Sequence, residues 1–124
     1  MQFRTDTKRV KALGTAKHGF GHWWMQRLTA VAMIPLGIWF VYSLMTMENL
    51  TPDTLMVWLH NPVPAMLMTL WTITVVYHAT LGLQVIIEDY VHGKTMALSL
   101  LVLVKFAMVF MLVVTFFSLF KLVS

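Results

Sequence analysis

The chain has 124 residues, of which 59% are hydrophobic and only 11% are charged, and its formal net charge is +4. A water-soluble domain of this size needs a more polar surface, so the composition excludes a soluble catalytic domain and predicts a membrane protein. The absence of cysteine excludes disulfides, covalent c-type haem attachment and thiolate-held iron–sulfur clusters within this chain.

The first 22 residues are predicted to be a polar, basic arm, in which glycines at positions 14, 19 and 21 argue against one rigid helix. The arm is not a signal peptide by pattern, because the apolar run that follows is long and lacks a clear small-residue cleavage site. Its basic charge is more typical of a positive-inside membrane anchor than of a nucleic-acid-binding segment. The cations that precede or open the first apolar run are Arg4, Lys8, Arg9, Lys11, Lys17 and Arg27.

Three apolar runs follow, over residues 28–47, 63–87 and 96–119. Each is long enough to cross hydrocarbon, which takes about 20 helical residues. We therefore predict an all-α membrane protein of one domain, residues 1–124, with transmembrane helices at about 23–47, 63–90 and 95–121. The first loop carries Glu48 and Asp53 without Lys or Arg, whereas the second carries Lys94. The positive-inside rule places the N-terminus and the second loop on the cytoplasmic or matrix side and the C-terminus on the opposite side.

Local signals refine these elements. Trp23 and Trp24 precede the first span, where amphipathic rings favour the headgroup level, and Pro35 predicts a mild kink within it. Thr51 before Pro52 predicts the start of a short interfacial helix, and Asn61-Pro62 repeats that signal at the start of the second span. Gly93 is the predicted C-cap of the second span.

His78 lies about halfway along the second span, which makes it a candidate functional residue. An unpaired polar ring in hydrocarbon costs several kcal/mol, on the order of 2–7 for a comparable polar group, so His78 must face protein, water or a cofactor. Two readings are open: axial ligation of a haem b, or a hydrogen bond to a neighbouring helix without metal. Gly82, one turn later, opens a slot for a flat macrocycle or for a close helix contact. One helical stripe holds Trp71, Thr74, His78, Gly82, Val85 and Asp89.

Two stretches resemble a known family. His78, Gly82, Asp89 and Tyr90 form an H-x3-G-x6-D-Y pattern, and residues 18–36 read HGFGHWWMQRLTAVAMIPL. Together they resemble the small hydrophobic membrane anchor of succinate dehydrogenase (respiratory Complex II) in its alphaproteobacterial or mitochondrial-like form. The resemblance covers nearly the whole chain, including the order of the three spans and the basic arm.

The resemblance implies a non-catalytic subunit that completes a succinate:ubiquinone oxidoreductase in the bacterial cytoplasmic membrane or the mitochondrial inner membrane. A second membrane anchor, also of three helices, is expected to share one haem b with this chain, and each of the two anchors is expected to give one histidine. His78 is the ligand that the match places here. Tyr90 is expected to hydrogen-bond ubiquinone, and Asp89 to shape that site. FAD and iron–sulfur clusters are expected only on a flavoprotein and an iron–sulfur protein docked on the cytoplasmic or matrix face.

Several side chains keep two readings. Tyr90 by position alone is also typical of an interfacial aromatic belt. Arg27 is a candidate partner for a haem propionate or for phospholipid, and Asp89 for Arg27, Lys94 or a proton relay. Glu88 is predicted to be a solvated helix-end acid, because it lies about 80° from the His78 stripe.

Lys105 and the other histidines have plainer interpretations. Lys105 in the third span has two readings, snorkelling toward the interface or bonding to carbonyls or to an acid of a partner, and the first is favoured. His18 and His22 are predicted to lie at the surface, since two histidines without a third ligand make a poor metal site, and His60 and His92 fall in predicted loops.

Two other classes of function compete with the haem- and quinone-binding anchor. One is a cofactor-free structural anchor or assembly protein of a respiratory complex. The other is a small transporter or proton channel, which the absence of an inverted repeat disfavours. The sequence predicts neither the choice between ubiquinone and menaquinone nor a trimer of the whole complex, although bacterial relatives leave a trimer open by resemblance.

Overall fold

The computed structural model describes residues 15–124, with side chains described from residue 19 onward. It contains α2 (Thr15–Met45), α3 (Pro52–His60), α4 (Pro62–Tyr90) and α5 (Lys94–Val123), and this part of the chain has no strand. The helices α2, α4 and α5 are each long and apolar enough to cross a membrane. The predicted all-α fold with three membrane-spanning helices is therefore confirmed.

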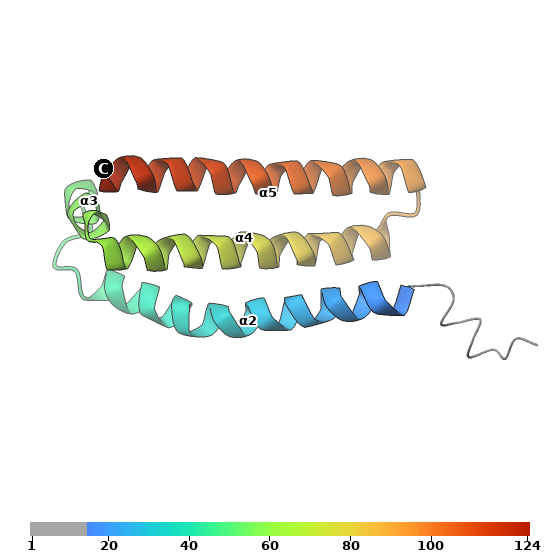
Figure 1. Ribbon diagram of the computed structural model, residues 1–124, viewed down its shortest axis with the longest axis horizontal. Helices are drawn as coiled ribbons and strands as arrows, with labels where there is room; N and C mark the ends of the chain where they lie inside the picture. Colours follow the sequence, from blue (N-terminus) through green and yellow to red (C-terminus); the bar gives the residue numbers. More distant parts are fainter. Residues whose placement is uncertain (1–14) are drawn as a thin grey trace, which may run out of the picture.

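The three long helices lie side by side in a row, with α4 in the centre (Figure 1). The main contacts are those of α4 with α5 and with α2, while the short α3 packs on α4 and α5 at one end. The N-terminal end of α2 and the turn between α4 and α5 share the opposite end of the row (Figure 1). This antiparallel arrangement agrees with the prediction that the N-terminus and the second loop lie on one side of the membrane.

The first helix begins earlier than predicted. It starts at Thr15, not near residue 23, and it runs through Gly19 and Gly21. A Cβ at either glycine would meet nothing within 4 Å, so neither position is forced to be glycine by packing. Glycine costs a helix about 1 kcal/mol relative to alanine. Satisfied backbone hydrogen bonds at a membrane surface outweigh that cost, which is why the glycines did not end the helix.

Pro35 lies inside α2 and does not interrupt it. The helix continues to Met45 with a shallow bow, as Figure 1 shows. The missing N–H of a proline and the clash of its ring bend a helix locally, and the rest of the hydrogen-bond ladder holds it together.

The helix α3 begins with a capping box. Thr51 Oγ1 accepts a hydrogen bond from the backbone N–H of Thr54 at 3.3 Å, and Thr54 Oγ1 accepts one from the Thr51 N–H at 3.1 Å. Asn61 caps α4 in the same sense, because its Oδ1 accepts from the Val63 N–H at 3.2 Å. Both predicted N-caps are thus confirmed.

Gly93 does not cap α4, so that prediction is wrong. Val91 is the C-cap of α4, and its N–H donates to the Ile87 carbonyl at 3.0 Å. Gly93 is instead the N-cap of α5, with a φ of −79° that any residue adopts. Glycine is therefore not needed at position 93 for backbone reasons.

A tight contact joins α2 to α4 at Gly37 and Trp71. A Cβ built on Gly37 would lie only 3.1 Å from Cη2 of Trp71, and the Trp71 ring stacks on Phe40 with centroids 6.0 Å apart. The absence of a side chain at Gly37 is what lets the indole ring occupy this space. A small residue thus serves here to bring α2 and α4 together.

The helix α3 contacts both α2 and α5. Trp58 of α3 stacks on Trp39 of α2 with ring centroids 5.6 Å apart. His60, which was predicted to lie in a loop, is the last residue of α3, and its Nδ1 donates to the Leu122 carbonyl of α5 at 3.2 Å. That bond satisfies a carbonyl in the last turn of α5, which is a structural role.

Little of the bundle is buried within this chain. In the described part the buried hydrophobic residues lie mainly on α4, and α5 contributes one; they are Ala65, Val76, Leu81, Ile87 and Leu119. Most large apolar side chains of α2 and α5 are exposed. Such surfaces are stable only against lipid or against another apolar subunit.

The Gly37–Trp71 contact predicts a position-specific cost of a larger side chain. Gly37→Val should lower the stability of the detergent-solubilised protein by about 1–3 kcal/mol, because the new methyl groups overlap the indole ring. Unfolding followed by circular dichroism against heat or denaturing detergent measures the effect. Gly21→Val, where nothing lies within 4 Å, is the matched control. Trp71→Leu should recover part of the loss, and equal losses in both glycine variants would contradict the contact.

The arrangement of the helices also predicts sidedness. The chain has no cysteine, so Asn49→Cys and His92→Cys each introduce a single thiol, one in the α2–α3 loop and one in the α4–α5 turn. A membrane-impermeant maleimide added to spheroplasts should label the thiol at position 49 and not that at 92, and inverted vesicles should reverse the pattern. Labelling of both from one face would contradict the antiparallel row.

Candidate functional site

His78 lies on the face of α4 that meets α2. Its ring is half-buried, and Nδ1 lies 2.9 Å from Oγ1 of Thr29 on α2. Within the described residues Nε2 makes no hydrogen bond, and it is not among the buried polar atoms that lack a partner. The hydrogen bond to a neighbouring helix, one of the two readings of His78, therefore exists but occupies one ring nitrogen and leaves the other accessible.

Thr29 is a residue that the sequence analysis did not single out. It is buried, and its Oγ1 also lies 2.8 Å from the Met25 carbonyl oxygen and 3.1 Å from that of Gln26. The signal for it was available, because His22, Gln26 and Thr29 are spaced i, i+4, i+7 and share one face of a helix. This polar stripe on α2 is the complement of the His78 stripe on α4.

The two stripes meet again one turn from His78. A Cβ built on Gly82 would lie 3.8 Å from Nε2 of Gln26, an ordinary van der Waals distance. The space beside Gly82 thus faces a polar amide of α2, and an alanine would fit there. His22 Nε2 and Gln26 Oε1 are buried and find no hydrogen-bond partner in the part of the chain that is described. The prediction that His22 lies at the surface is wrong for this nitrogen, and the side chain of His18 lies outside the described residues.

Asp89 and Tyr90 form the exposed end of α4, at the end of the row where α2 begins (Figure 1). Tyr90 is 76% exposed, so its phenol is available to another molecule. Among the described residues no salt bridge joins Asp89 to Arg27 or Lys94, so the pairing considered for Asp89 is not observed. Twelve residues separate His78 from Tyr90, which is about 18 Å of helix at 1.5 Å per residue.

The neighbouring acid differs from Asp89. Glu88 Oε1 accepts a hydrogen bond from Nε2 of Gln84 at 2.8 Å, and the carboxylate is exposed. This i, i+4 pair on the helix surface is what a solvated helix-end acid forms, in agreement with its prediction.

Two cations of the spans lie on outer surfaces. The Arg27 guanidinium sits 5.1 Å from the centre of the Trp23 ring, one turn earlier on the same helix. Arg27 lies about 160° around α2 from Thr29, so it points away from the His78 seam. Lys105 is exposed on α5, beside Val102 and Phe106.

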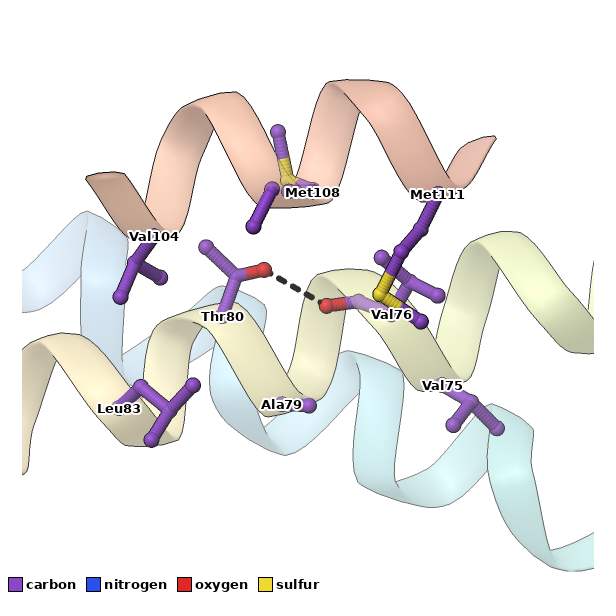
Figure 2. A pocket seen from close by; sticks show the side chains of 9 residues that line it. Val75, Val76, Ala79, Thr80, Leu83, Val104, Met108 and Met111 are labelled. Carbon is purple, nitrogen blue, oxygen red and sulfur yellow. Dashed lines mark hydrogen bonds between the residues drawn. The ribbon is translucent and has the colours of Figure 1, made fainter. Parts of the chain in front are cut away.

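An apolar groove lies between α4 and α5, on the side of α4 opposite to its contact with α2 (Figure 2). Its one hydroxyl, on Thr80, donates to the Val76 carbonyl at 2.8 Å, so no polar group is left to orient a ligand. The groove is suited to packing and not to chemistry. Its lining comprises Val75, Val76, Ala79, Thr80, Leu83, Val104, Ala107, Met108 and Met111.

The donor set at His78 decides which metal group it suits. Within the described residues no cluster of three or more His, Cys, Asp or Glu side chains exists that would hold a bare metal ion. A single imidazole nitrogen suits an iron whose other ligands come from a macrocycle and from another chain. His22 does not lie beside His78. It is seven residues, about 10 Å of helix, from Thr29, which is level with His78.

Comparison with known proteins shows similarity to membrane subunits of one family. A model of the family described as "Succinate dehydrogenase/Fumarate reductase transmembrane subunit" matches residues 1–119. The succinate dehydrogenase hydrophobic membrane anchor subunit of Rickettsia bellii is 33% identical over 103 residues, covering 83% of this chain and 82% of that protein. The protein of the same name from Paracoccus denitrificans is 30% identical over 95 residues, covering 77% of this chain and 74% of that one. The succinate dehydrogenase membrane anchor subunit of Reclinomonas americana is 30% identical over 94 residues, covering 71% and 76%.

Proposed function

This chain belongs to the succinate dehydrogenase/fumarate reductase transmembrane subunit family, and we propose that it holds the iron of one haem b through His78 and presents Tyr90 to a quinone. Its role as a multi-pass membrane anchor follows from its three apolar helices and from the names of its relatives. The proposal adds a cofactor and a substrate to that role. The single observation that carries it is the half-buried His78 ring, with Nδ1 bonded across to α2 and Nε2 left accessible.

His78 suits a haem for three reasons. It lies near the middle of α4, where an imidazole without a bonding partner lowers the stability of a membrane protein. Its Nδ1 already has the outer partner that metal-bound histidines require. One imidazole from this chain would be enough to help hold a haem, because the macrocycle supplies the other nitrogen ligands of its iron. When bound, a haem b supplies one-electron redox chemistry at this depth.

The second axial ligand is proposed to come from another membrane anchor. The central helix α4 contacts α2 and α5 on opposite sides, which leaves its other two sides with little cover from this chain. A second three-helix anchor packed there would bury both His78 and much of the exposed apolar surface. The resemblance to the small anchor of succinate dehydrogenase supports such a partner, together with a soluble flavoprotein and an iron–sulfur protein that carry FAD and the clusters.

Tyr90 suits the quinone end of the reaction. Reduction of a quinone consumes two electrons and two protons, and negative charge builds on the carbonyl oxygen during the reaction. The exposed phenol of Tyr90 donates a hydrogen bond to that oxygen, at a membrane surface where water resupplies protons. Asp89, exposed and without an ion pair in the described residues, shapes the same site.

Gly82 and Arg27 are two further candidates for residues that would lie beside the haem. Gly82 lies one turn from His78 on the same seam and adds no bulk there. Arg27 faces outward and contacts Trp23, so both readings of Arg27, a haem propionate and a lipid phosphate, stay predictions. A propionate would have to reach the outer side of α2 to meet it.

His78→Ala in the purified complex should abolish or strongly reduce the b-type haem band in the reduced-minus-oxidised spectrum. The reason is that the chain then offers no nitrogen to the iron at this depth. His92→Ala, which removes an exposed imidazole from the α4–α5 turn, is the control and should keep the full band. A full band in the His78 variant would exclude His78 as a ligand and favour a cofactor-free anchor.

Tyr90→Phe should lower succinate–quinone reductase turnover by about a hundredfold, the low end of what a positioned proton donor contributes. Succinate oxidation by a water-soluble dye should be unchanged, because the variant leaves the soluble partner proteins intact. Tyr42→Phe removes an exposed hydroxyl near the other end of the bundle and serves as the control. Wild-type quinone turnover in the Tyr90 variant would remove this residue from the site.

A further inference from the structure

The hydrogen bond between Thr29 and His78 also determines which ring nitrogen carries the proton. A threonine hydroxyl has one hydrogen and two lone pairs. Two carbonyl oxygens, which only accept, lie 2.8 and 3.1 Å from Thr29 Oγ1, on Met25 and Gln26. The hydroxyl hydrogen directed at these carbonyls leaves a lone pair of the same oxygen facing His78 Nδ1 at 2.9 Å. In that arrangement Nδ1 carries the ring hydrogen and donates it to Thr29.

We propose that Thr29 is the positioning residue for the haem ligand, holding His78 as the Nδ1–H tautomer so that Nε2 presents its lone pair to the iron. The inference rests on the proposed function and assigns a role to Thr29, which lies within residues 18–36 but outside the H-x3-G-x6-D-Y pattern that contains the ligand. A neutral imidazole binds iron through its unprotonated nitrogen, so the opposite tautomer would block the site.

The surroundings of Thr29 suit this task. The residue is 8% exposed, so water does not compete for the bond. Its β-branched side chain has few rotamers in a helix, and the bonds to Met25 and Gln26 hold the hydroxyl in one of them. The acceptor belongs to α2 and the ring to α4, so the packing of these two helices sets the ring's orientation.

The bond also affects the redox properties of the iron. Donation from Nδ1–H increases the electron density on Nε2 and makes the imidazole a stronger ligand, which favours the oxidised iron. Loss of the acceptor should therefore weaken haem binding and raise the midpoint potential. These are changes in the cofactor itself, which an effect on turnover alone would not show.

The test uses Thr29→Val and Thr29→Ala in the fully assembled complex, beside Thr29→Ser. The valine and alanine variants should bind haem about tenfold more weakly, as loss of an outer partner of a metal-bound histidine does. Their midpoint potential should rise and the low-spin ferric resonance should shift, whereas serine should keep wild-type values. Alanine adds no bulk, so it keeps the test decisive if valine disturbs assembly.

Thr80→Val is the matched control. Thr80 is also 8% exposed, and its hydroxyl bonds the Val76 carbonyl four residues earlier at 2.8 Å, but it faces α5 and no histidine (Figure 2). This variant should keep wild-type haem affinity and potential. Equal changes in the Thr29 and Thr80 variants would reduce the effect to helix packing and overturn the inference.

His78→Ala separates the two proposals. If it loses the haem while the Thr29 variants keep wild-type affinity, potential and resonance, the positioning role is wrong and the ligand assignment stands. If His78→Ala keeps the haem, the ligand assignment fails and the inference fails with it.

Discussion

Inside hydrocarbon every polar group must find a partner in the protein, and this constraint sorts the polar side chains of the bundle. The hydroxyls of Ser43, Thr69 and Thr72 each donate to the carbonyl four residues earlier, at 2.8–2.9 Å, and are satisfied within their own helix. Thr29 does the same and in addition bonds His78. In the part of the chain that is described, this is the only side-chain hydrogen bond between two of the three long helices. This bond therefore joins α2 to α4 at the depth of His78, beyond what the stability of either helix alone requires.

The same constraint makes this chain an incomplete structure on its own. Three helices in a row give α4 two neighbours, and no large side chain from residue 19 onward is closed off almost entirely from its surroundings. Within α5 the only buried residue is Leu119, near the C-terminal end of the helix. Lipid covers an apolar surface as well as a protein does, so hydrophobicity alone would not call for a partner. The accessible Nε2 of His78 does, because lipid offers it nothing to bind.

The sequence was sufficient for the spans and for both proline-associated N-caps, because these depend on run length and local capping chemistry. The cost of burying an imidazole also singled out His78, whose role as a ligand stays a prediction. The sequence was not sufficient for Thr29 or for the Gly37–Trp71 contact. In a soluble helix the apolar stripe reveals the packed face, but a helix that is apolar all round carries no such stripe. The faces that meet are set by small residues and single polar groups, and their pairing becomes visible only in three dimensions. The early start of α2 was missed because glycine signals lose weight where a continuous hydrogen-bond ladder is strongly favoured. The role of Gly93 was missed because α4 reaches its C-cap two residues before it, at Val91.

The helix α4 separates two kinds of chemistry by its length. At its middle, His78 is half-buried and is bonded to the Thr29 hydroxyl, which accepts the ring hydrogen in the proposed tautomer. At its end, about 18 Å away by helical rise, Tyr90 is open to the surroundings, where water exchanges protons freely. Electrons cross such a distance more readily when a carrier stands between, whereas protons need a continuous polar path. In the proposed function, the length of α4 therefore keeps the haem iron at His78 apart from the proton-coupled reduction of the quinone at Tyr90.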